Sequence, residues 1–592
     1  MAKNDDLPGM VDWYNPWQLI DTGRKTAIST IIGENADPRL VSPAEDGTFF
    51  DYSKELVVDA DGMLKADGAD RNEIWIDYVS DVGDGWNSTY SVARSLAALS
   101  LDAGGARVPR GEILIFGGDA VYPTANTDKY KRRLVDPYRF AFDASRNGST
   151  AYDPADLKKT PHVFALPGNH DWYDSLVAFQ KLFCTHVFNE RIFAGGWRTR
   201  QERSYFALKL PQRWWLLGVD LQLTHNIDVS QLQYFESIVE EMEAGDKLIL
   251  SVPEPYWVKA IKYDGMTEEF AVKEASIEKL EDFFTSRGIA VKLYVAGDLH
   301  HYRRFENAKY VQKITAGGGG AFLHPTHDFD FRAADKKQKR EFKLVGEYPS
   351  MPDSRKQDWK NLYFGLNNKT FGILTAILYP LAAWLINANV SGPFTFKHAI
   401  AATVNRMIEA PLATLVILGL VFGLIAFTDS NSKRQKYGGG LLHASAHLAA
   451  IFALGWFGYW VSEALVARWQ VASYTMANVI WFLCIMIIPA VGGYFVGSAI
   501  MGLYLFISLH IFGRHDNEAF SAMKLDDFRN FLRMHIDRDG NLTIYPFKIH
   551  KVPKFSPTVE NGEIVGCKGD GEVEAELIEK PIIINDADAG GK

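Results

Sequence analysis

The sequence lacks the features that define several protein classes. It has only three cysteines in 592 residues, Cys184, Cys484 and Cys567. Their odd number and wide spacing exclude a disulfide framework and a cysteine zinc site. Basic residues are not in excess, because the formal net charge is −9 and the sequence pI is about 6.0. We therefore expect no nucleic-acid partner, since such a partner requires a basic surface.

The N-terminal residues also lack an apolar core of signal-peptide length. They read MAKNDDLPGMVDWYNPW, which mixes acidic, aromatic and small residues. We expect no signal peptide, and we expect the polar residues up to about 365 to lie in the cytoplasm. A chain of 592 residues exceeds the size of one ordinary domain, so at least two domains are expected.

Charge is nearly absent from one long region, although the mean hydropathy of the whole chain is only −0.11. A membrane-spanning helix needs about 20 apolar residues. Five segments of residues 366–513 have this character: 371–388, 411–428, 441–463, 474–490 and 493–512. As one helix, residues 474–513 would extend for roughly 60 Å. We therefore expect a turn near Gly492 and Gly493 and an all-α bundle of four or five membrane helices.

The basic loop DSNSKRQKYGGG predicts the orientation of these segments. Lys433, Arg434 and Lys436 place this loop in the cytoplasm, on the same side as the N-terminal region. Five crossings would leave residues 514–592 outside, although these residues resemble an intracellular domain. An even number of crossings would remove the conflict, and the sequence does not decide between them.

Residues 514–592 predict a small α+β domain with a flexible acidic end. The stretch DRDGNLTIYP resembles half of a calcium loop, but no Glu stands at its closing position. A β-hairpin that turns at Asp539-Gly540 is the preferred interpretation. The expected organisation is an N-terminal extension at 1–70 that packs on the next domain, a catalytic domain at 70–365, membrane helices at 366–513, and this tail.

Acidic residues and histidines follow successive apolar runs in the N-terminal half. The runs with their polar ends are EIWIDYVSD, EILIFGGD, HVFALPGNHDW, WWLLGVD, KLILSVPEPYW and VKLYVAGDLHH. Helical patterns such as STYSVARSLAALSL lie between some of them, which indicates an α/β fold with a largely parallel or mixed sheet. Since the carboxyl ends of such strands share one crevice, these polar residues are expected to meet there.

Three of these runs resemble the motifs of the calcineurin-like metallophosphoesterase superfamily: GGD at 117–119, PGNHDW at 167–172 and GDLHHYRR at 297–304. The resemblance covers roughly residues 70–330. It implies a four-layer αββα sandwich of two sheets with two divalent ions at the strand ends. It also implies hydrolysis of a phosphoester or an anhydride.

The resemblance implies a role for each matching residue. Asp119 would bridge the two ions, Asn169 would bind one and His300 the other. Asp81 would match the acid of the first motif. His170 would be catalytic rather than a ligand, by donating to the leaving oxygen or by steadying the phosphate.

Three positions depart from the family pattern. The first motif lacks its histidine, for which Asp84 is the expected substitute. Glu254 stands near the position of a second missing histidine, and Asp298 replaces the first histidine of the last motif. Because these changes enrich the site in carboxylates, we expect Mn²⁺ to be favoured, with Mg²⁺, iron or Zn²⁺ as alternatives.

Residues around the last motif are further candidates. Arg303 and Arg304 would contact phosphate, with surface ion pairs as the alternative, and His301 is a weaker candidate. The run TAGGGGAFLHPTH is expected to form a tight loop between strands, and the alternative is that its backbone amides bind a phosphate. His324 and His327 would line the substrate entrance.

The membrane segments favour a phosphorylated or pyrophosphate-linked lipid as the substrate. The alternatives are a soluble nucleotide or phosphoprotein, with the helices as an anchor or a homo-oligomer surface, and an inactive membrane sensor or transporter whose phosphoesterase-like domain only binds. His443 and His447 would belong to an intramembrane site or to interhelical hydrogen bonds.

Overall fold

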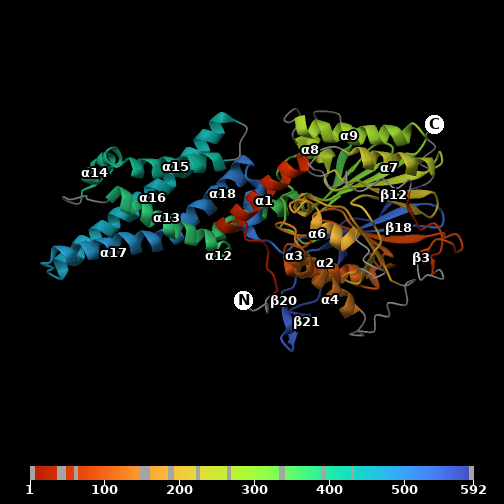
Figure 1. Cartoon of the computed structure of the whole chain (residues 1–592), viewed down its shortest axis with the longest axis horizontal. Coiled ribbons are helices and arrows are strands. Elements are labelled where there is room, and N and C mark those ends of the chain that lie inside the picture. Colours follow the sequence, from red (N-terminus) through yellow and green to blue (C-terminus); the bar gives the residue numbers. More distant parts are fainter. Residues whose placement is uncertain are drawn as a thin grey trace. The chain divides into compact units, whose positions relative to one another are not determined.

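The computed structural model describes residues 7–35, 48–58, 64–145, 160–184, 193–221, 227–262, 268–332, 341–387, 395–428 and 432–585. The chain forms two compact units. We call the first the sheet unit; it comprises Met1–Val11, Asp21–Met351 and Leu525–Lys592. We call the second the helical unit; it comprises Asp12–Ile20 and Pro352–Lys524. Figure 1 shows the elements of both along the chain.

The first sheet of the sheet unit contains eight strands among the described residues. In spatial order they are β1 (Phe50–Asp51), β11 (Phe206–Leu210), β12 (Trp214–Gly218), β13 (Lys247–Val252), β14 (Ala290–Ala296), β16 (Gln312–Ala316), β15 (Tyr302–Glu306) and β17 (Lys343–Tyr348). The central strands β12, β13, β14 and β16 are parallel. Strand β13 is buried along its whole length, which explains why its sequence, KLILSV, is nearly all apolar.

The second sheet joins strands from both ends of the chain. Its described strands are β22 (Glu576–Leu577), β19 (Leu542–Ile549), β18 (Arg529–Ile536), β4 (Ile74–Val79), β7 (Ile113–Phe116), β8 (His162–Ala165), β10 (Trp197–Thr199) and β9 (Phe193–Ala194), with β23 (Ile582–Ile584) beside β19. Strands β4, β7, β8 and β10 are parallel. The sheet is therefore mixed, as the α/β prediction requires.

Helices cover both sheets. Helices α2 (Trp86–Ala97) and α4 (Asp136–Ser145) share an apolar core with the second sheet. Helices α7 (Val229–Glu240), α8 (Tyr256–Lys262) and α9 (Glu268–Thr285) accompany the first. The two sheets contact each other, because the ring centroids of Phe164 and Phe206 lie 5.1 Å apart.

The sheet unit also contains short helical segments and two-stranded pairs. The helical segments are α3 (Thr127–Tyr130), η2 (Lys131–Val135), α5 (Asn169–Trp172), α6 (Val177–Phe179) and η3 (Gln180–Cys184). The strand pairs are β2–β3 (Val57–Val58, Leu64–Lys65), β5–β6 (Ser100–Asp102, Arg107–Pro109) and β20–β21 (Phe555–Glu560, Glu563–Gly569).

The C-terminal strands differ from the separate tail domain expected from the sequence. Strand β18 pairs with β4 in antiparallel register, with Arg533 opposite Asp77. These two side chains form a buried ion pair, in which Nε lies 2.6 Å from Oδ1. The predicted hairpin is confirmed, because β18 and β19 pair around Asp537–Asn541 and Gly540 has a φ of 80°. The apolar faces of this hairpin are thus buried in the main sheet, and residues 586–592 of the predicted acidic end lie outside the described residues.

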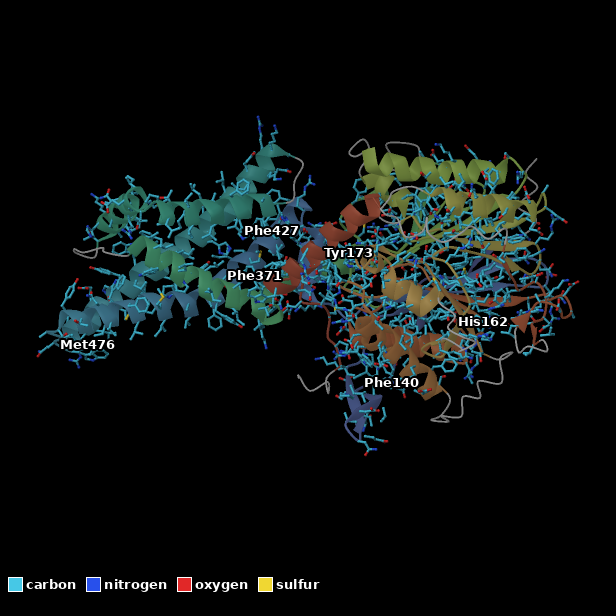
Figure 2. The ribbon with its side chains drawn as sticks, in the orientation of Figure 1. Phe140, His162, Tyr173, Phe371, Phe427 and Met476 are labelled. Atoms are coloured by element: carbon cyan, nitrogen blue, oxygen red, sulfur yellow. The ribbon has the colours of Figure 1, made fainter. Side chains whose placement is uncertain are left out.

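The helical unit consists of long apolar helices and short segments that adjoin them. Its described elements are η4 (Asp358–Tyr363), α12 (Phe364–Asn367), α13 (Lys369–Asn387), α14 (Phe396–Glu409), α15 (Pro411–Phe427), α16 (Lys433–Arg468), α17 (Tyr474–Gly492), η5 (Gly493–Gly497), α18 (Ser498–Phe512) and α19 (Asp516–Met523), while α11 (Met351–Gln357) and α1 (Pro16–Asn35) extend across the unit boundaries. Large apolar side chains such as Met476 are exposed along these helices (Figure 2). Such surfaces suit a lipid environment.

Among the described residues, three helices are long and apolar enough to cross a membrane: Lys369–Ile386, Lys433–Arg468 and Tyr474–Phe512. Helices α14 and α15 bend by 103° at their junction and would together supply a fourth span. This finding supports the prediction of a membrane protein with several spans. The predicted orientation in the membrane stays a prediction.

The turn predicted near Gly492 and Gly493 is wrong. Gly492 has helical dihedral angles, with φ −60° and ψ −42°, and the helix continues to Phe512 through the π-helical turn η5. A Cβ atom on Gly492 would lie 2.5 Å from Leu454, and one on Gly493 would lie 2.7 Å from the carbonyl oxygen of Thr375. These glycines therefore permit close helix packing rather than a reversal of the chain.

Candidate active site

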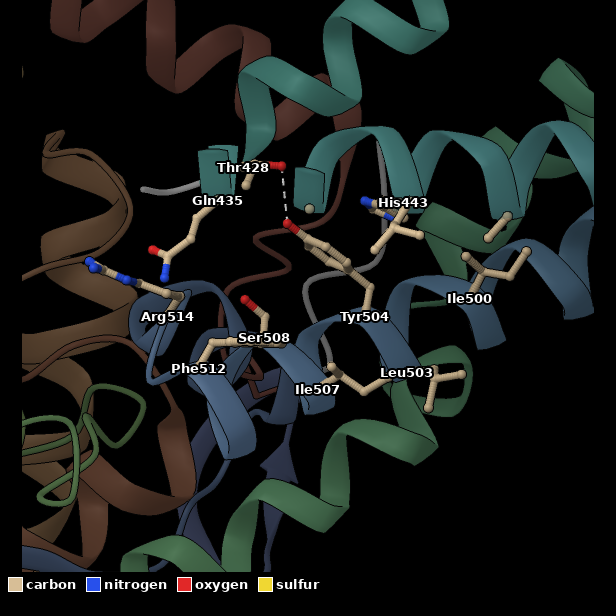
Figure 3. Close-up of a pocket in the computed structure, with 13 residues that line it drawn as sticks. Thr428, Gln435, His443, Ile500, Leu503, Tyr504, Ile507, Ser508, Phe512 and Arg514 are labelled. Atoms are coloured by element: carbon tan, nitrogen blue, oxygen red, sulfur yellow. Dashed lines mark hydrogen bonds between the residues drawn. The ribbon is translucent and has the colours of Figure 1, made fainter. Parts of the chain in front are cut away.

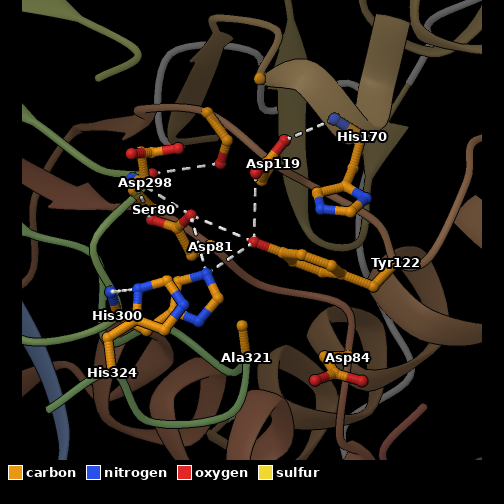
Figure 4. A network of polar contacts seen from close by, with 12 residues as sticks. Ser80, Asp81, Asp84, Asp119, Tyr122, His170, Asp298, His300, Ala321 and His324 are labelled. Atoms are coloured by element: carbon orange, nitrogen blue, oxygen red, sulfur yellow. Dashed lines mark hydrogen bonds and ion pairs between the residues drawn. The ribbon is translucent and has the colours of Figure 1, made fainter. Parts of the chain in front are cut away.

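Four polar residues that follow three strands lie close together in the sheet unit. Asp81 follows β4, Asp119 follows β7, and Asp298 and His300 follow β14. Figure 4 shows the side chains of Asp81, Asp119 and His300 around the hydroxyl group of Tyr122. The predicted convergence of Asp81, Asp119 and His300 is therefore present, and it includes a tyrosine that the sequence interpretation missed.

The Tyr122 hydroxyl group contacts three acceptors. Its oxygen lies 3.1 Å from Oδ1 of Asp81, 3.2 Å from Oδ2 of Asp119 and 3.0 Å from Nε2 of His300. The other ring nitrogen of His300, Nδ1, lies 2.6 Å from the carbonyl oxygen of Phe322. Since a carbonyl only accepts, Nδ1 carries the proton and Nε2 is an acceptor. One hydroxyl proton therefore faces three acceptors.

Backbone conformation brings the carboxylates together. Asp81, Asp119 and Asp298 have φ values of 59°, 44° and 65°, in the left-handed region that non-glycine residues rarely adopt. Such strain is typical of functional sites. The glycines of the motifs let the chain approach closely, because a Cβ on Gly168 would lie 2.0 Å from Oδ1 of Asp119 and one on Gly297 would lie 2.6 Å from Oδ2 of Asp81.

The electrostatic environment of this cluster favours a bound cation. Burial raises the pKa of Asp81 to about 7. Burial and the nearby carboxylates Asp81 and Asp171 raise the pKa of Asp119 well above its usual range. Burial also lowers the pKa of His300 to about 3, so its imidazole is neutral at pH 7. A cation in contact with the acceptors would replace the protons that the carboxylates otherwise hold.

The loop of the GNHD motif lies beside Asp119. The backbone amide of His170 donates to Oδ1 of Asp119 at 2.9 Å, and Asn169 donates through its side-chain amide to the hydroxyl of Tyr173 at 2.8 Å. Asp171 accepts from the backbone amides of Gly168 and Ala120 and so holds the two loops together. Asp171 is thus a positioning residue.

His170 is placed as a neutral imidazole. Its Nδ1 lies 2.7 Å from the carbonyl oxygen of Pro123 and therefore carries a proton. Burial lowers the pKa of His170 to about 4, although the bond to Pro123 opposes this shift. A donating role therefore requires that Nε2 takes up a second proton, for example when a phosphate dianion binds nearby.

The predicted ligands Glu254 and Asp298 hold a lysine between them. The ammonium group of Lys259, in α8, lies 3.0 Å from Oδ2 of Asp298 and also contacts Oε2 of Glu254. Burial lowers the pKa of Lys259, but the two carboxylates raise it more, so the net pKa is above its usual value. Lys259 is the second functional candidate that the sequence interpretation missed.

Asp84 is held away from the cluster around Tyr122. Its Oδ1 accepts from the backbone amide of Val11 at 2.7 Å, and its Oδ2 accepts from that of Phe322 at 3.2 Å. Figure 4 shows its carboxylate pointing away from Tyr122. Among these bonds, the Tyr122 hydroxyl rather than Asp84 contacts Asp81, Asp119 and His300.

The predicted phosphate-binding residues are engaged in ion pairs. Arg303 is buried and lies 2.9 Å from Oδ1 of Asp328. Arg304 pairs with Glu579 at 2.7 Å. These contacts agree with the structural alternative considered for both arginines, although that alternative placed them at the surface.

The histidines near the last motif take different positions. His301 is buried, with its Nδ1 3.3 Å from the carbonyl oxygen of His324. The ring of His324 stacks on that of His300, with centroids 3.9 Å apart. His324 therefore supports a cluster residue, whereas His301 faces the interior.

The family resemblance implies divalent metal ions, which we tested against the residues present. Within the described part of the chain, no group of three or more His, Cys, Asp or Glu side chains is arranged to hold a metal ion. Asp81, Asp119 and His300 fit one hard cation when the phenol oxygen of Tyr122 is counted as a ligand. All three side chains already direct an acceptor atom toward the same hydroxyl group. The set around Lys259 does not fit a cation, because an ammonium group already lies between its carboxylates.

The helical unit contains a separate polar cluster and a pocket. His447 lies 3.1 Å from His443 and 2.7 Å from the hydroxyl of Tyr379, which joins α16 to α13. This bond agrees with the interhelical interpretation of the two histidines. Next to them is a cavity of about 320 Å³ with mostly apolar walls, lined also by Tyr504, Gln435 and Arg514 (Figure 3). The cavity has the composition of a site for an apolar chain.

Comparisons with known proteins bear on the sheet unit. Residues 74–302 match the family model described as calcineurin-like phosphoesterase. A solved structure, GAP50, the anchor in the inner membrane complex of Plasmodium, is 10% identical, with a TM-score of 0.30, over 43% of this chain and 74% of that chain. A search of curated proteins gave no significant match.

Proposed function

We propose that this chain, in which residues 74–302 form a calcineurin-like phosphoesterase domain, is a cation-dependent hydrolase that cleaves a phosphoester or anhydride bond of a membrane lipid. The observation that carries the proposal is the convergence of Asp81, Asp119 and His300 on the Tyr122 hydroxyl. We also propose the four-layer αββα order for the sheet unit. The contact between the two sheets and the helices beside each support that order.

Each residue of the cluster has a distinct task in this proposal. Asp81, Asp119, Tyr122 and His300 would hold a hard cation, for which Mn²⁺, Mg²⁺ or iron suits this oxygen-rich set better than Zn²⁺. When bound, such a cation polarises a phosphoryl oxygen and lowers the pKa of water. The Phe322 carbonyl fixes the His300 ring so that Nε2 faces the cluster.

His170 is proposed to act on the leaving group. A bound phosphate dianion stabilises the imidazolium, so Nε2 takes up a proton that it then donates to the leaving oxygen. The bond from Nδ1 to Pro123 holds the ring during both steps. Asn169, whose amide is oriented by Tyr173, borders the same place and would bind a phosphoryl oxygen or the cation.

A lipid substrate is proposed because the chain contains helices that are apolar enough to cross a membrane. An enzyme attached to a bilayer meets lipid head groups at high local concentration. A soluble nucleotide or phosphoprotein would meet the same residues, and the experiment below therefore compares the two substrate classes.

Hydrolysis by the full-length chain in detergent micelles tests the proposal. With Mn²⁺ present, we expect phosphate release from a phosphorylated or pyrophosphate-linked lipid to exceed release from a nucleotide. Asp119→Asn should lower the rate at least about 100-fold, because it removes a carboxylate from the proposed ligand set. The matched control is Asp102→Asn, at the exposed end of β5, where Asp102 accepts a local bond from the backbone amide of Gly105.

One observation favours a second candidate, a domain that binds phosphate without turnover. Lys259 and the Tyr122 hydroxyl lie among the carboxylates at both positions where the family would place ions. If the purified chain bound phosphate or a phosphorylated lipid but released none in the assay above, the sensor function would replace the hydrolase.

A further inference from the structure

A lysine side chain separates two residues that the family resemblance would assign to the second metal ion. Glu254 follows β13, and Asp298 follows β14, the neighbouring parallel strand. Lys259 reaches both carboxylates from the first turns of α8, and its side chain is only 18% exposed. The contact to Asp298 spans 3.0 Å, which is the length of a charge-assisted hydrogen bond.

The packing of helix α8 positions this lysine. Its first turn packs Tyr256, Trp257 and Val258 into the apolar core of the first sheet. Lys259 is the next residue, and its backbone amide bonds to the carbonyl oxygen of Pro255 at 3.3 Å. The side chain is therefore directed by the packing of its neighbours, and the ion pair does not depend on a flexible surface segment.

The ammonium group of Lys259 supplies a positive charge between the two carboxylates without a second ion. Asp298 donates through its backbone amide to both oxygens of Asp81, at 3.1 and 2.9 Å, which joins the Lys259 pair to the cluster around Tyr122. The Lys259 pair and the cluster around Tyr122 thus form one site with carboxylates in each part. The ammonium group of Lys259 lies in the part that contains Glu254. A divalent ion at that side would lie against the ammonium group, and like charges at such a distance repel strongly in a buried site.

We propose that the ammonium group of Lys259 takes the place of the second metal ion, so that the chain binds one metal ion per active site rather than two. The inference rests on the proposed function for the first ion at Asp81, Asp119, Tyr122 and His300. It assigns Lys259 a fixed positive charge beside the phosphoryl group, where the family would use a metal. Lysine is a compact point charge that suits this task.

Metal content tests the inference without reference to turnover. The full-length chain is loaded with Mn²⁺ in detergent, freed of weakly held metal by gel filtration, and analysed for manganese per chain. We expect one ion for the wild type and two for Lys259→Ala. The control is Lys247→Ala, which removes a buried lysine at the amino end of β13. Lys247 contacts the carbonyl oxygen of Gly540, and the Lys247→Ala variant should still bind one ion.

Electron paramagnetic resonance gives an independent readout. The wild type should show the hyperfine pattern of an isolated Mn²⁺ ion, and Lys259→Ala should show the broadened pattern of two coupled ions. Lys259→Met, which keeps the stem and removes the charge, serves if the alanine variant does not fold. Two ions in the wild type, or no additional ion in the lysine variants, would overturn the inference while leaving the hydrolase proposal intact. A wild type that binds one ion but shows no hydrolysis would overturn the hydrolase proposal and support one metal ion per chain.

Discussion

Tyr122 connects the residues that the sequence motifs identify separately. Its single hydroxyl proton can be donated to only one of the three acceptors around it at a time, in a buried site. A bound cation would satisfy all of them together. The phenol oxygen is then a ligand or the nearest neighbour of the ligands.

Replacement of this hydroxyl should weaken metal binding. We expect Tyr122→Phe to lower the affinity for Mn²⁺ about 10- to 100-fold, which is the usual effect of removing a group that orients metal ligands. Equilibrium dialysis measures the change. Tyr234→Phe is the control, because the Tyr234 hydroxyl bonds to the carbonyl oxygen of Thr48 outside the cluster. Equal affinities for the wild type and Tyr122→Phe would exclude this role.

Metal binding should depend on pH through Asp81. Because burial raises the pKa of Asp81 to about 7, its carboxyl is protonated below pH 7, and the proton competes with the cation. The affinity for Mn²⁺ should therefore fall up to about tenfold per pH unit from pH 7 to pH 5 and level off above about pH 8. Titrations at constant ionic strength measure the slope, and a flat profile would show that Asp81 does not hold the ion.

The sequence identifies carboxylates and imidazoles better than their partners. Asp119, Asn169 and His300 stand in motifs whose spacing reports their place at strand ends. Tyr122 and Lys259 stand in stretches, GGDAVY and PYWVK, that read as ordinary packing segments. Only three-dimensional distances show that the Tyr122 hydroxyl and the Lys259 ammonium group reach the carboxylates. The predicted role of Asp84 as a ligand stays a prediction, although its carboxylate accepts from the backbone amide of Val11.

Strand β18 is the element that ties the C-terminal residues to the sheet unit. Arg533 on β18 and Asp77 on β4 are both fully buried and form two hydrogen bonds, at 2.6 and 3.0 Å. A buried ion pair that loses one partner leaves an uncompensated charge in the interior. The pair therefore favours the observed register, in which Arg533 stands opposite Asp77.

Loss of this pair should destabilise the sheet unit. We expect Arg533→Ala to lower its stability by about 3–5 kcal/mol, seen as an earlier transition of the sheet unit in thermal unfolding in detergent. Lys551→Ala is the control; Lys551 is 79% exposed and pairs with Asp527 at 2.7 Å, so its removal should cost about 0–1 kcal/mol. If the two variants melted together, the buried pair would not hold β18 in place.

Elements with strong local patterns were predictable from the sequence. The apolar runs of β4, β7, β13 and β14 and the long helices are visible in windows of a few residues. The pairing of β18 with β4 was not, because it joins residues 456 positions apart and alternation alone does not name a partner. The continuous helix across Gly492 was also missed, since a glycine pair serves helix packing as well as it serves a turn.

At the scale of the whole molecule, the shared sheet limits the membrane topology. Because β4 and β18 belong to one sheet, we expect the residues before and after the apolar helices to lie on the same side of the membrane. We therefore expect an even number of crossings: α13, the bent pair α14–α15, α16, and α17 with α18, which makes four. This arrangement also places Lys433, Arg434 and Lys436 on the side of the sheet unit, as the positive-inside rule requires.

Accessibility of the two chain ends tests this topology. Epitope tags at the N-terminus and the C-terminus should both be protected from a protease added outside intact cells, and both should become accessible when the membrane is permeabilised. A tag inserted between α13 and α14 should be cleaved without permeabilisation. Opposite behaviour of the two terminal tags would mean that the number of crossings is odd.

The pairing of β18 with β4 also has a consequence for biosynthesis. At 5–20 residues per second, the ribosome needs about 25 to 90 s to make the 456 residues that separate Asp77 from Arg533. During that interval the edge of β4 that later pairs with β18 has no partner strand, while the hydrophobic helices enter the bilayer. A nascent chain that fails to insert correctly would deliver β18 to the wrong compartment, and its phosphoesterase domain would be left unfinished and open to degradation.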